Sequence, residues 1–266
     1  MNRLLKTGFK SYFRSIFFYI ALVLSIATPE YDNMDPGQSI EIELFIISIV
    51  IVWHIGREYS NGGFANKLIC GYGRTKIFLS ELIVALSVSF ILYGIYSAKI
   101  ISMTTLIFDT LYMTSLIRIL LAMFMLMCTV VTILVAFNMI VGKRSLGIIL
   151  SIILVVALLV GPEIIDAYTE VNDIEGNEGV TEWVIVNSQK LFPEYHTNYA
   201  AGIYNHFIYR RDNYRYDLAI KLGILEKQHL DSKSSGIINE AYIYSLIVST
   251  LAGVTGCMLF KKKDIK

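Results

Sequence analysis

Charged residues are scarce in this 266-residue chain, where they make up 17% of the sequence against 55% hydrophobic residues. A soluble domain carries about 25% charged residues, so this deficit excludes an ordinary soluble protein. Proline and glycine are also few, with 4 and 18 residues, and so much apolar surface excludes a disordered chain. A GxxxxGK[ST] phosphate loop is absent, which leaves no such site for ATP. We predict an all-α integral membrane protein.

Metal-ligating residues show no pattern that indicates a bound ion. The three cysteines lie far apart in the sequence, so neither a disulfide framework nor a paired CxxC metal site can be drawn. His196, His206 and His229 have no regular ligand spacing. We therefore expect no cofactor and no metal on this chain.

Uncharged stretches predict six transmembrane helices, because a hydrocarbon core of about 30 Å needs about 20 helical residues. A further apolar stretch at residues 100–117 is expected to be an outer-surface or re-entrant segment, since a seventh span would put the basic carboxy-terminal tail outside. The six candidate spans are residues 15–27, 44–56, 82–98, 119–142, 146–161 and 241–260.

Basic residues indicate which side of the membrane each connection faces. They precede the first span, fill the connection between the second and third, separate the fourth from the fifth and follow the sixth. With six spans all of these segments fall on one side, so we expect a multi-pass protein of the cell membrane with both termini in the cytoplasm. The basic residues are Arg3, Lys6, Lys10, Arg14, Arg57, Lys67, Arg74, Lys76, Lys143, Arg144, Lys261, Lys262, Lys263 and Lys266.

The first fourteen residues have the pattern of an amphipathic helix. Lys6, Lys10 and Arg14 recur every four positions, while Leu5 and Phe9 make the other face. We predict a helix that lies in the membrane interface, in contact with lipid. The alternative is a basic flank that only orients the first span.

Residues 162–240 form a connection too long to lack structure of its own, so we predict an extracytoplasmic domain there. Arginines and tyrosines alternate in its second half. Such a pattern can bind nucleic acid, but the outside position leads us to expect no nucleic-acid partner. The domain is expected either to present a solvated surface or to cover the outer mouth of a translocation path. The chain then divides into a membrane domain (1–161), this outer domain, and a last span with a basic tail (241–266).

The connection 57–76 between the second and third predicted spans is the most patterned part of the chain. Asn61 can cap a short helix, Phe64 and Leu68 lie one turn apart on one face, and Gly71 is a natural stop. These apolar side chains are exposed to the cytoplasm unless they dock on something. We predict a docking element, and a loop that lies on its own lipid surface is the alternative.

The sequence of this connection resembles the cytoplasmic loop of type-2 ABC transporter permeases. The matching runs are Glu58-Tyr-Ser-Asn-Gly62, Asn66-Lys67-Leu68 and Gly71-Tyr-Gly73-Arg74-Thr75-Lys76. In that family a Glu and a Gly precede a short coupling helix with a Leu, and a Ser or Thr near an Arg follows it. The amphipathic start, the six predicted spans and the Leu-Phe-Lys-Lys-Lys ending are also similar. The chain departs from the family pattern at Gly63, where Thr is common, at Gly71, where Pro is common, and at Glu81, where many relatives are basic or neutral.

The resemblance implies a membrane subunit that is not itself an enzyme. ATP and Mg²⁺ would be held by a separate cytoplasmic ABC ATPase, and two copies of this permease, or two similar permeases, would pair with two ATPases. Relatives commonly serve bacterial peptide export, bacteriocin immunity or drug efflux, so the expected substrate is amphipathic or hydrophobic, with an amphipathic peptide as the first choice. The residues that the resemblance assigns to the ATPase contact are Glu58, Asn61, Gly62, Phe64, Asn66, Lys67, Leu68, Gly71 and Arg74.

Two other functions are weighed against the exporter. A membrane enzyme would need paired Asp, a Ser–His pair or a His–Glu metal cluster inside the spans, and the predicted spans contain none. A scaffold or sensor that binds ligand through residues 162–240 is the remaining alternative, and it predicts no ATPase partner. His54 is expected to be structural, and snorkelling is the simpler account of Glu81 and Arg118 at the span ends.

Overall fold

The computed structural model describes residues 1–27, 36–105, 110–142, 144–171 and 227–263. Within these ranges every regular element is an α-helix, which confirms the predicted all-α class. The helices are α1 (Asn2–Phe13), α2 (Ile16–Ala27), α3 (Pro36–Ser60), α4 (Gly63–Ile69), α5 (Arg74–Thr105), α6 (Thr110–Val141), α7 (Arg144–Val171) and α11 (Lys227–Lys262).

Three of these helices are long and apolar enough to cross a membrane. They are Arg74–Ser102 within α5, Leu120–Val141 within α6 and Tyr242–Lys262 within α11. A fourth would be added if α1 and α2, which are bent by 66° relative to each other, make one span. The described part of the chain is thus compatible with a membrane protein, and six spans remain a prediction.

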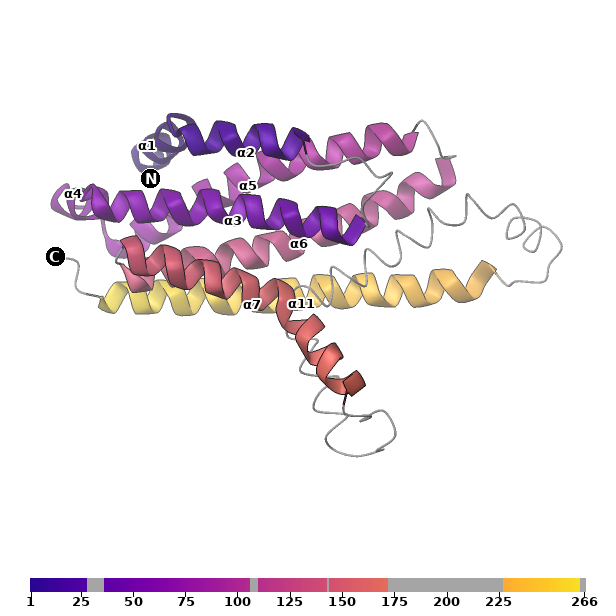
Figure 1. Cartoon of the computed structure of the whole chain (residues 1–266). Coiled ribbons are helices and arrows are strands. Elements are labelled where there is room, and N and C mark those ends of the chain that lie inside the picture. Colours follow the sequence, from indigo (N-terminus) through magenta and orange to yellow (C-terminus); the bar gives the residue numbers. More distant parts are fainter. Residues whose placement is uncertain (28–35, 106–109, 143, 172–226, 264–266) are drawn as a thin grey trace.

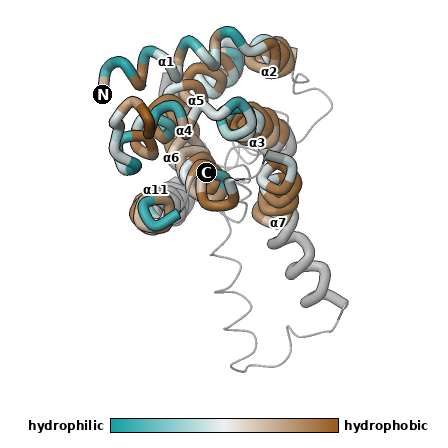
Figure 2. The backbone as a smooth tube through the Cα atoms, turned by 90° about the vertical axis from the view of Figure 1, so that its left-hand side faces the viewer, coloured by the Kyte–Doolittle hydropathy of each residue, from teal (hydrophilic) through white to brown (hydrophobic). Residues whose placement is uncertain are grey.

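The long helices lie side by side in one bundle (Figure 1). α11 packs along α6, α3 packs against α6 and α7, and α1 and α2 pack against α5. The helix α4, the amino-terminal helix α1 and the carboxy-terminal end of α11 all lie at one end of the bundle, which we call the α4 end (Figure 1). Figure 2 looks at this end and shows hydrophilic residues gathered there, with hydrophobic residues along the helices behind.

Small residues allow the closest helix contacts, as they do in membrane bundles. A Cβ atom at Gly256 of α11 would collide with Ala136 of α6. A Cβ atom at Gly8 of α1 would lie 2.9 Å from a methyl carbon of Val84 in α5. Glycine at these two positions therefore sets how near α11 and α1 approach their neighbours.

The helices extend beyond the predicted spans. Residues 100–105 complete α5 and residues 110–117 begin α6, while 106–109 lie outside the described residues, so an outer-surface or re-entrant position of this stretch stays a prediction. Lys99 lies within α5, and its Nζ donates a hydrogen bond of 3.1 Å to the carbonyl of Ile26 at the end of α2.

Both edges of the predicted outer domain 162–240 are helical continuations. The helix α7 runs on to Val171 and α11 begins at Lys227. The last part of α7, which includes Pro162, points away from the bundle (Figure 1). The centre of the predicted domain, at 172–226, lies outside the described residues, and with it His196 and His206.

Candidate functional site

The helix α4 is closed at both ends by glycines with a left-handed backbone. Gly62 is the N-cap with φ 68°, and Gly71 follows the helix with φ 83°. Glycine adopts this conformation without a steric cost. The N–H of Tyr72 bonds to the carbonyl of Lys67 at 3.1 Å and that of Gly71 to Leu68 at 2.9 Å, the pair of bonds that ends a helix at an αL glycine. The prediction for Gly71 is confirmed.

The prediction that Asn61 caps α4 was wrong. Gly62 occupies the capping position, and no side chain caps the helix. The helix α3 reaches Ser60 and α5 begins at Arg74. The predicted connection 57–76 therefore includes the last turn of α3 and the start of α5, and only α4 with its two short flanks lies between them.

Phe64, on the inner face of α4, is buried by its own chain. The side chain is 1% exposed, and its ring centroid lies 4.5 Å from that of Tyr59 on α3 and 6.3 Å from that of Phe260 on α11. Leu68 is partly buried against the same core. The expectation that Phe64 is exposed to the cytoplasm unless it docks on a partner was wrong, because α3 and α11 of the same chain cover it. Leu68 is half-buried, and a contact with an ATPase stays a prediction.

Lys67 of α4 meets two carboxylates. Its Nζ lies 2.9 Å from Oε2 of Glu58 in the last turn of α3 and 2.6 Å from Oε1 of Glu81 in α5. The Lys67 side chain is 11% exposed and that of Glu81 3%. Burial by itself lowers the pKa of Lys67, but the charges of Glu81 and Glu58 outweigh burial and hold this pKa above its ordinary value. Lys67 is therefore a charged link between α3, α4 and α5.

The prediction that Glu81 snorkels toward water was wrong. Its side chain is buried, and beyond Lys67 its second oxygen Oε2 lies 3.6 Å from Nε2 of His54. The His54 ring stacks on Tyr12 of α1 with 3.5 Å between centroids. The Glu81 carboxylate has Lys67 of α4 and His54 of α3 as its neighbours, so it need not reach solvent.

Ser11 connects α1 to the same corner of the bundle. Its hydroxyl donates to Oε1 of Glu58 at 3.2 Å. Arg57 donates from Nη2 to the Ser11 carbonyl at 2.7 Å and to the Ser11 hydroxyl at 2.8 Å. Arg57, Glu58, Lys67 and Glu81, which we call the charged cluster, thus combine two acidic and two basic side chains.

The last residues of α11 are tied to the start of α5 and to the last turn of α6. Arg74 donates from Nη1 to the carbonyl of Lys261 at 2.9 Å and also to that of Lys263. Nζ of Lys263 donates to the carbonyls of Ile140 at 2.7 Å and Met139 at 3.2 Å. These carbonyls belong to the last turn of α6, where a cation also complements the helix dipole.

The outer face of α4 is open to solvent. Ile69 is 83% exposed, more than any other large hydrophobic side chain among the described residues. Asn66 and Cys70 beside it are also exposed. Ile69 is absent from the residues assigned to the ATPase contact. Helical geometry of about 100° per residue is the signal that identifies it, because five positions place Ile69 about 140° from Phe64.

The residues that the sequence assigned to one contact therefore divide between the interior and the surface. Phe64 is buried, while Glu58, Gly62, Lys67, Leu68 and Arg74 are half-buried, and Asn61, Asn66 and Gly71 are exposed.

Glu43 of α3 is a second buried carboxylate, and sequence reasoning missed it because the predicted span began one residue later. The residue is 1% exposed and accepts a 2.8 Å hydrogen bond from the hydroxyl of Ser25 in α2. Its partner stands 18 positions away in the sequence, and no local pattern indicates the pairing.

Among the described residues, no three His, Cys, Asp or Glu side chains are placed to hold a metal ion. No protein-family model matches the chain, and no curated protein matches it significantly. The structure by itself defines an all-helical protein with helices able to cross a membrane and a short helix anchored at one end of the bundle.

Proposed function

We propose that this chain is the membrane-spanning permease subunit of an ATP-driven exporter, and that a separate cytoplasmic ATPase acts on α4. The observation that carries the proposal is the contrast between the two faces of α4. The inner face is joined to α3, α5 and α11 through Lys67 and Phe64, while Ile69 on the outer face is exposed. A partner that binds the outer face of α4 and displaces this helix would also move the helices to which α4 is joined. ATP would be hydrolysed on the partner, since the chain lacks a phosphate loop.

Six spans are part of the proposal, with α2, α3 and α7 added to the three long apolar helices. The 25 residues of α3 extend about 37 Å, more than the roughly 30 Å of hydrocarbon. The apolar part of α7, Ser145–Leu158, covers about 21 Å, so this span would need residues beyond it. The 12 residues of α2 cover about 18 Å, so this span would need the residues that follow it. The contacts of Glu81 with Lys67 and His54 support a span that contains this acid, because charges in a bilayer are expected to be paired. Glu43 accepts a hydrogen bond from Ser25 of α2.

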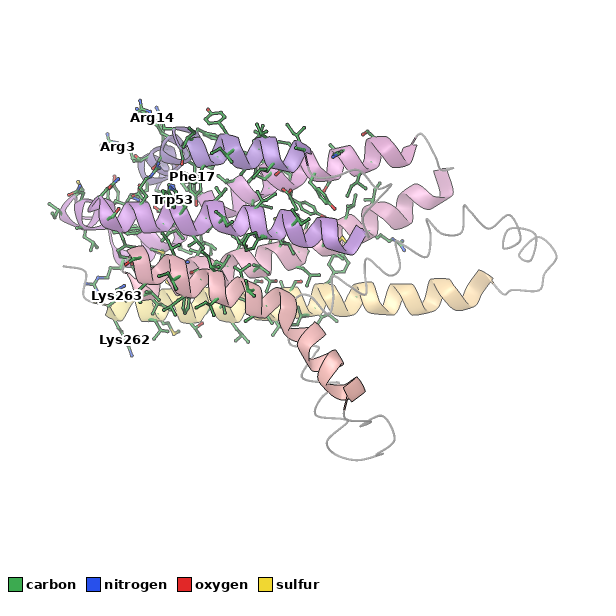
Figure 3. All side chains as sticks on the ribbon, in the orientation of Figure 1. Arg3, Arg14, Phe17, Trp53, Lys262 and Lys263 are labelled. Carbon is green, nitrogen blue, oxygen red and sulfur yellow. The ribbon has the colours of Figure 1, made fainter. Side chains whose placement is uncertain are left out.

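The α4 end would face the cytoplasm, with both termini on that side. Arg3 and Arg14 of α1 and Lys262 and Lys263 at the end of α11 all lie at this end (Figure 3). An excess of Lys and Arg near span ends favours the cytoplasmic side. The cell membrane is then the proposed location.

An amphipathic or hydrophobic substrate, with a peptide as the first choice, would leave along apolar surface between two permease copies. Supporting this choice, a shallow groove between α3 and α7 has no charged side chain in its lining. The apolar lining residues are Phe45, Ile49, Val52, Trp53, Ile148, Ile152 and Val155.

The experiment is copurification of an ATPase with the tagged chain in mild detergent from its native membrane. We expect near one-to-one recovery with the wild type and loss with Ile69→Asp, at unchanged membrane level. Thr7→Asp adds the same charge to an exposed position of α1 and should keep the ATPase. Phe64→Asp is unsuitable here, because it changes the interior of the bundle. If the wild type recovers no ATPase in several detergents, the exporter is excluded and the scaffold or sensor alternative takes its place.

A further inference from the structure

A single lysine separates two carboxylates where α3, α4 and α5 meet. Oε2 of Glu58 and Oε1 of Glu81 lie 2.9 and 2.6 Å from the same Nζ of Lys67. The two carboxylates therefore lie close to each other, and each belongs to a different long helix. Only the lysine is carried by α4.

Without Lys67 the two carboxylates would face each other with little water between them. Like charges at short range in a poorly solvated site repel strongly, so the two groups either move apart or share a proton. Separation gives a longer distance between α3 and α5, and a shared proton does not. The remaining basic groups do not replace the ammonium group, since Arg57 is directed to Ser11 and Nε2 of His54 lies 3.6 Å from the other oxygen of Glu81. The spacing of α3 and α5 at this end thus depends on where α4 holds its lysine.

We propose that Lys67 is the positioning residue through which α4 controls the separation of α3 and α5. Displacing α4 outward withdraws the ammonium group, and repulsion between Glu58 and Glu81 then moves the two helix ends apart. The inference rests on the proposed function, because the ATPase supplies the displacement.

The first test needs no ATPase and measures the separation directly. Spin labels are placed at Ser60→Cys, at the end of α3, and Thr75→Cys, at the start of α5, both exposed. The native cysteines Cys70, Cys128 and Cys257 are replaced by alanine. Pulsed EPR then gives the distance distribution between labels in the purified chain.

Lys67→Met should shift this distribution to longer distance and lower the melting temperature by about 10 °C, because it leaves buried charge unpaired. Adding Glu81→Gln removes the repulsion, so the double variant should return to the wild-type distance and recover more than half of the lost melting temperature. An unchanged distance in Lys67→Met contradicts the inference. If the Lys67→Met protein does not accumulate in the membrane, the double variant is measured alone. A double variant that also fails to accumulate would contradict the inference as well.

The second test uses the complex with its ATPase and separates docking from transmission. Copurification of the ATPase with the double variant Lys67→Met with Glu81→Gln is measured first, and loss of the ATPase would place Lys67 in the contact itself and contradict its role as a positioning residue. ATP with vanadate should lengthen the label distance in the wild-type complex and leave it unchanged in the double variant. A double variant that responds like the wild type overturns the role of Lys67, whereas a wild type that recovers no ATPase overturns the proposed function.

Discussion

The two faces of α4 have apolar side chains of similar size in opposite surroundings. Phe64 is 1% exposed and Ile69 is 83% exposed, although they lie five residues apart on one short helix. The inner side chain is covered by aromatic rings of the same chain, and the outer one meets solvent. Apolar periodicity in a short helix therefore first identifies the face that its own bundle covers. A docking surface has to be sought on the opposite side.

Aspartate substitutions on the inner and outer faces of α4 are expected to give the largest difference in stability. Phe64→Asp buries a carboxylate among Tyr59 and Phe260 and should cost about 4 kcal/mol or more, enough to reduce the folded protein in the membrane. Ile69→Asp should change stability by less than about 0.5 kcal/mol. Fluorescence-detected size exclusion after a temperature series measures both. Equal losses would show that the two faces do not differ.

The contact between α11 and α6 offers a comparison of two glycines. Gly256→Val should cost about 2 kcal/mol, because the added side chain collides with Ala136. Gly253→Ala is the matched control, since its new Cβ would lie 3.6 Å from Thr132, an ordinary contact. Thermal unfolding in detergent distinguishes the two, and a tolerated Gly256→Val would contradict close packing here.

Glycine at position 63 leaves room for the charged cluster. A Cβ atom there would collide with the Glu58 carboxylate, so Gly63→Ala should push Glu58 away from Lys67 and cost about 1 kcal/mol. Gly73→Ala meets nothing within 4 Å and should be close to neutral. The difference should become small when Glu58→Ala is the common background, since truncation removes the colliding carboxylate, as a double-mutant cycle of melting temperatures would show.

The smallest effect is expected at the tail of α11. Lys263→Met removes a cation from the last carbonyls of α6 and should cost about 0.3–1 kcal/mol. Burial lowers the pKa of Lys263. The partial loss of solvation offsets part of the stabilisation that its charge gives to the end of α6. Lys262→Met, at an exposed neighbour, should have no measurable effect on the melting temperature. A larger loss at Lys262 than at Lys263 would be the contrary result.

The sequence predicted features that depend on nearby residues. The apolar runs indicated helices, and Gly71 marked the end of α4 because a helix stop needs only local backbone geometry. Burial of Phe64, Glu43 and Glu81 could not be predicted in this way. Their partners come from other helices, such as Phe260 for Phe64, and sequence periodicity carries no information about which distant helix will cover a face. The count of spans depends on such distant contacts too, since Glu43 in α3 is hydrogen-bonded by Ser25 of α2 and Glu81 in α5 is paired with Lys67 of α4.

The measurement that tests the account most directly is photo-crosslinking from the two faces of α4. A benzophenone amino acid replaces Ile69 in one protein and Phe64 in another, and membranes are irradiated before purification. The account predicts that position 69 crosslinks to a separate polypeptide identified by mass spectrometry as an ATPase, while position 64 crosslinks only within its own chain, to α3 or α11. Crosslinks to the ATPase from position 64, or none from position 69 in membranes that contain the ATPase, would contradict it.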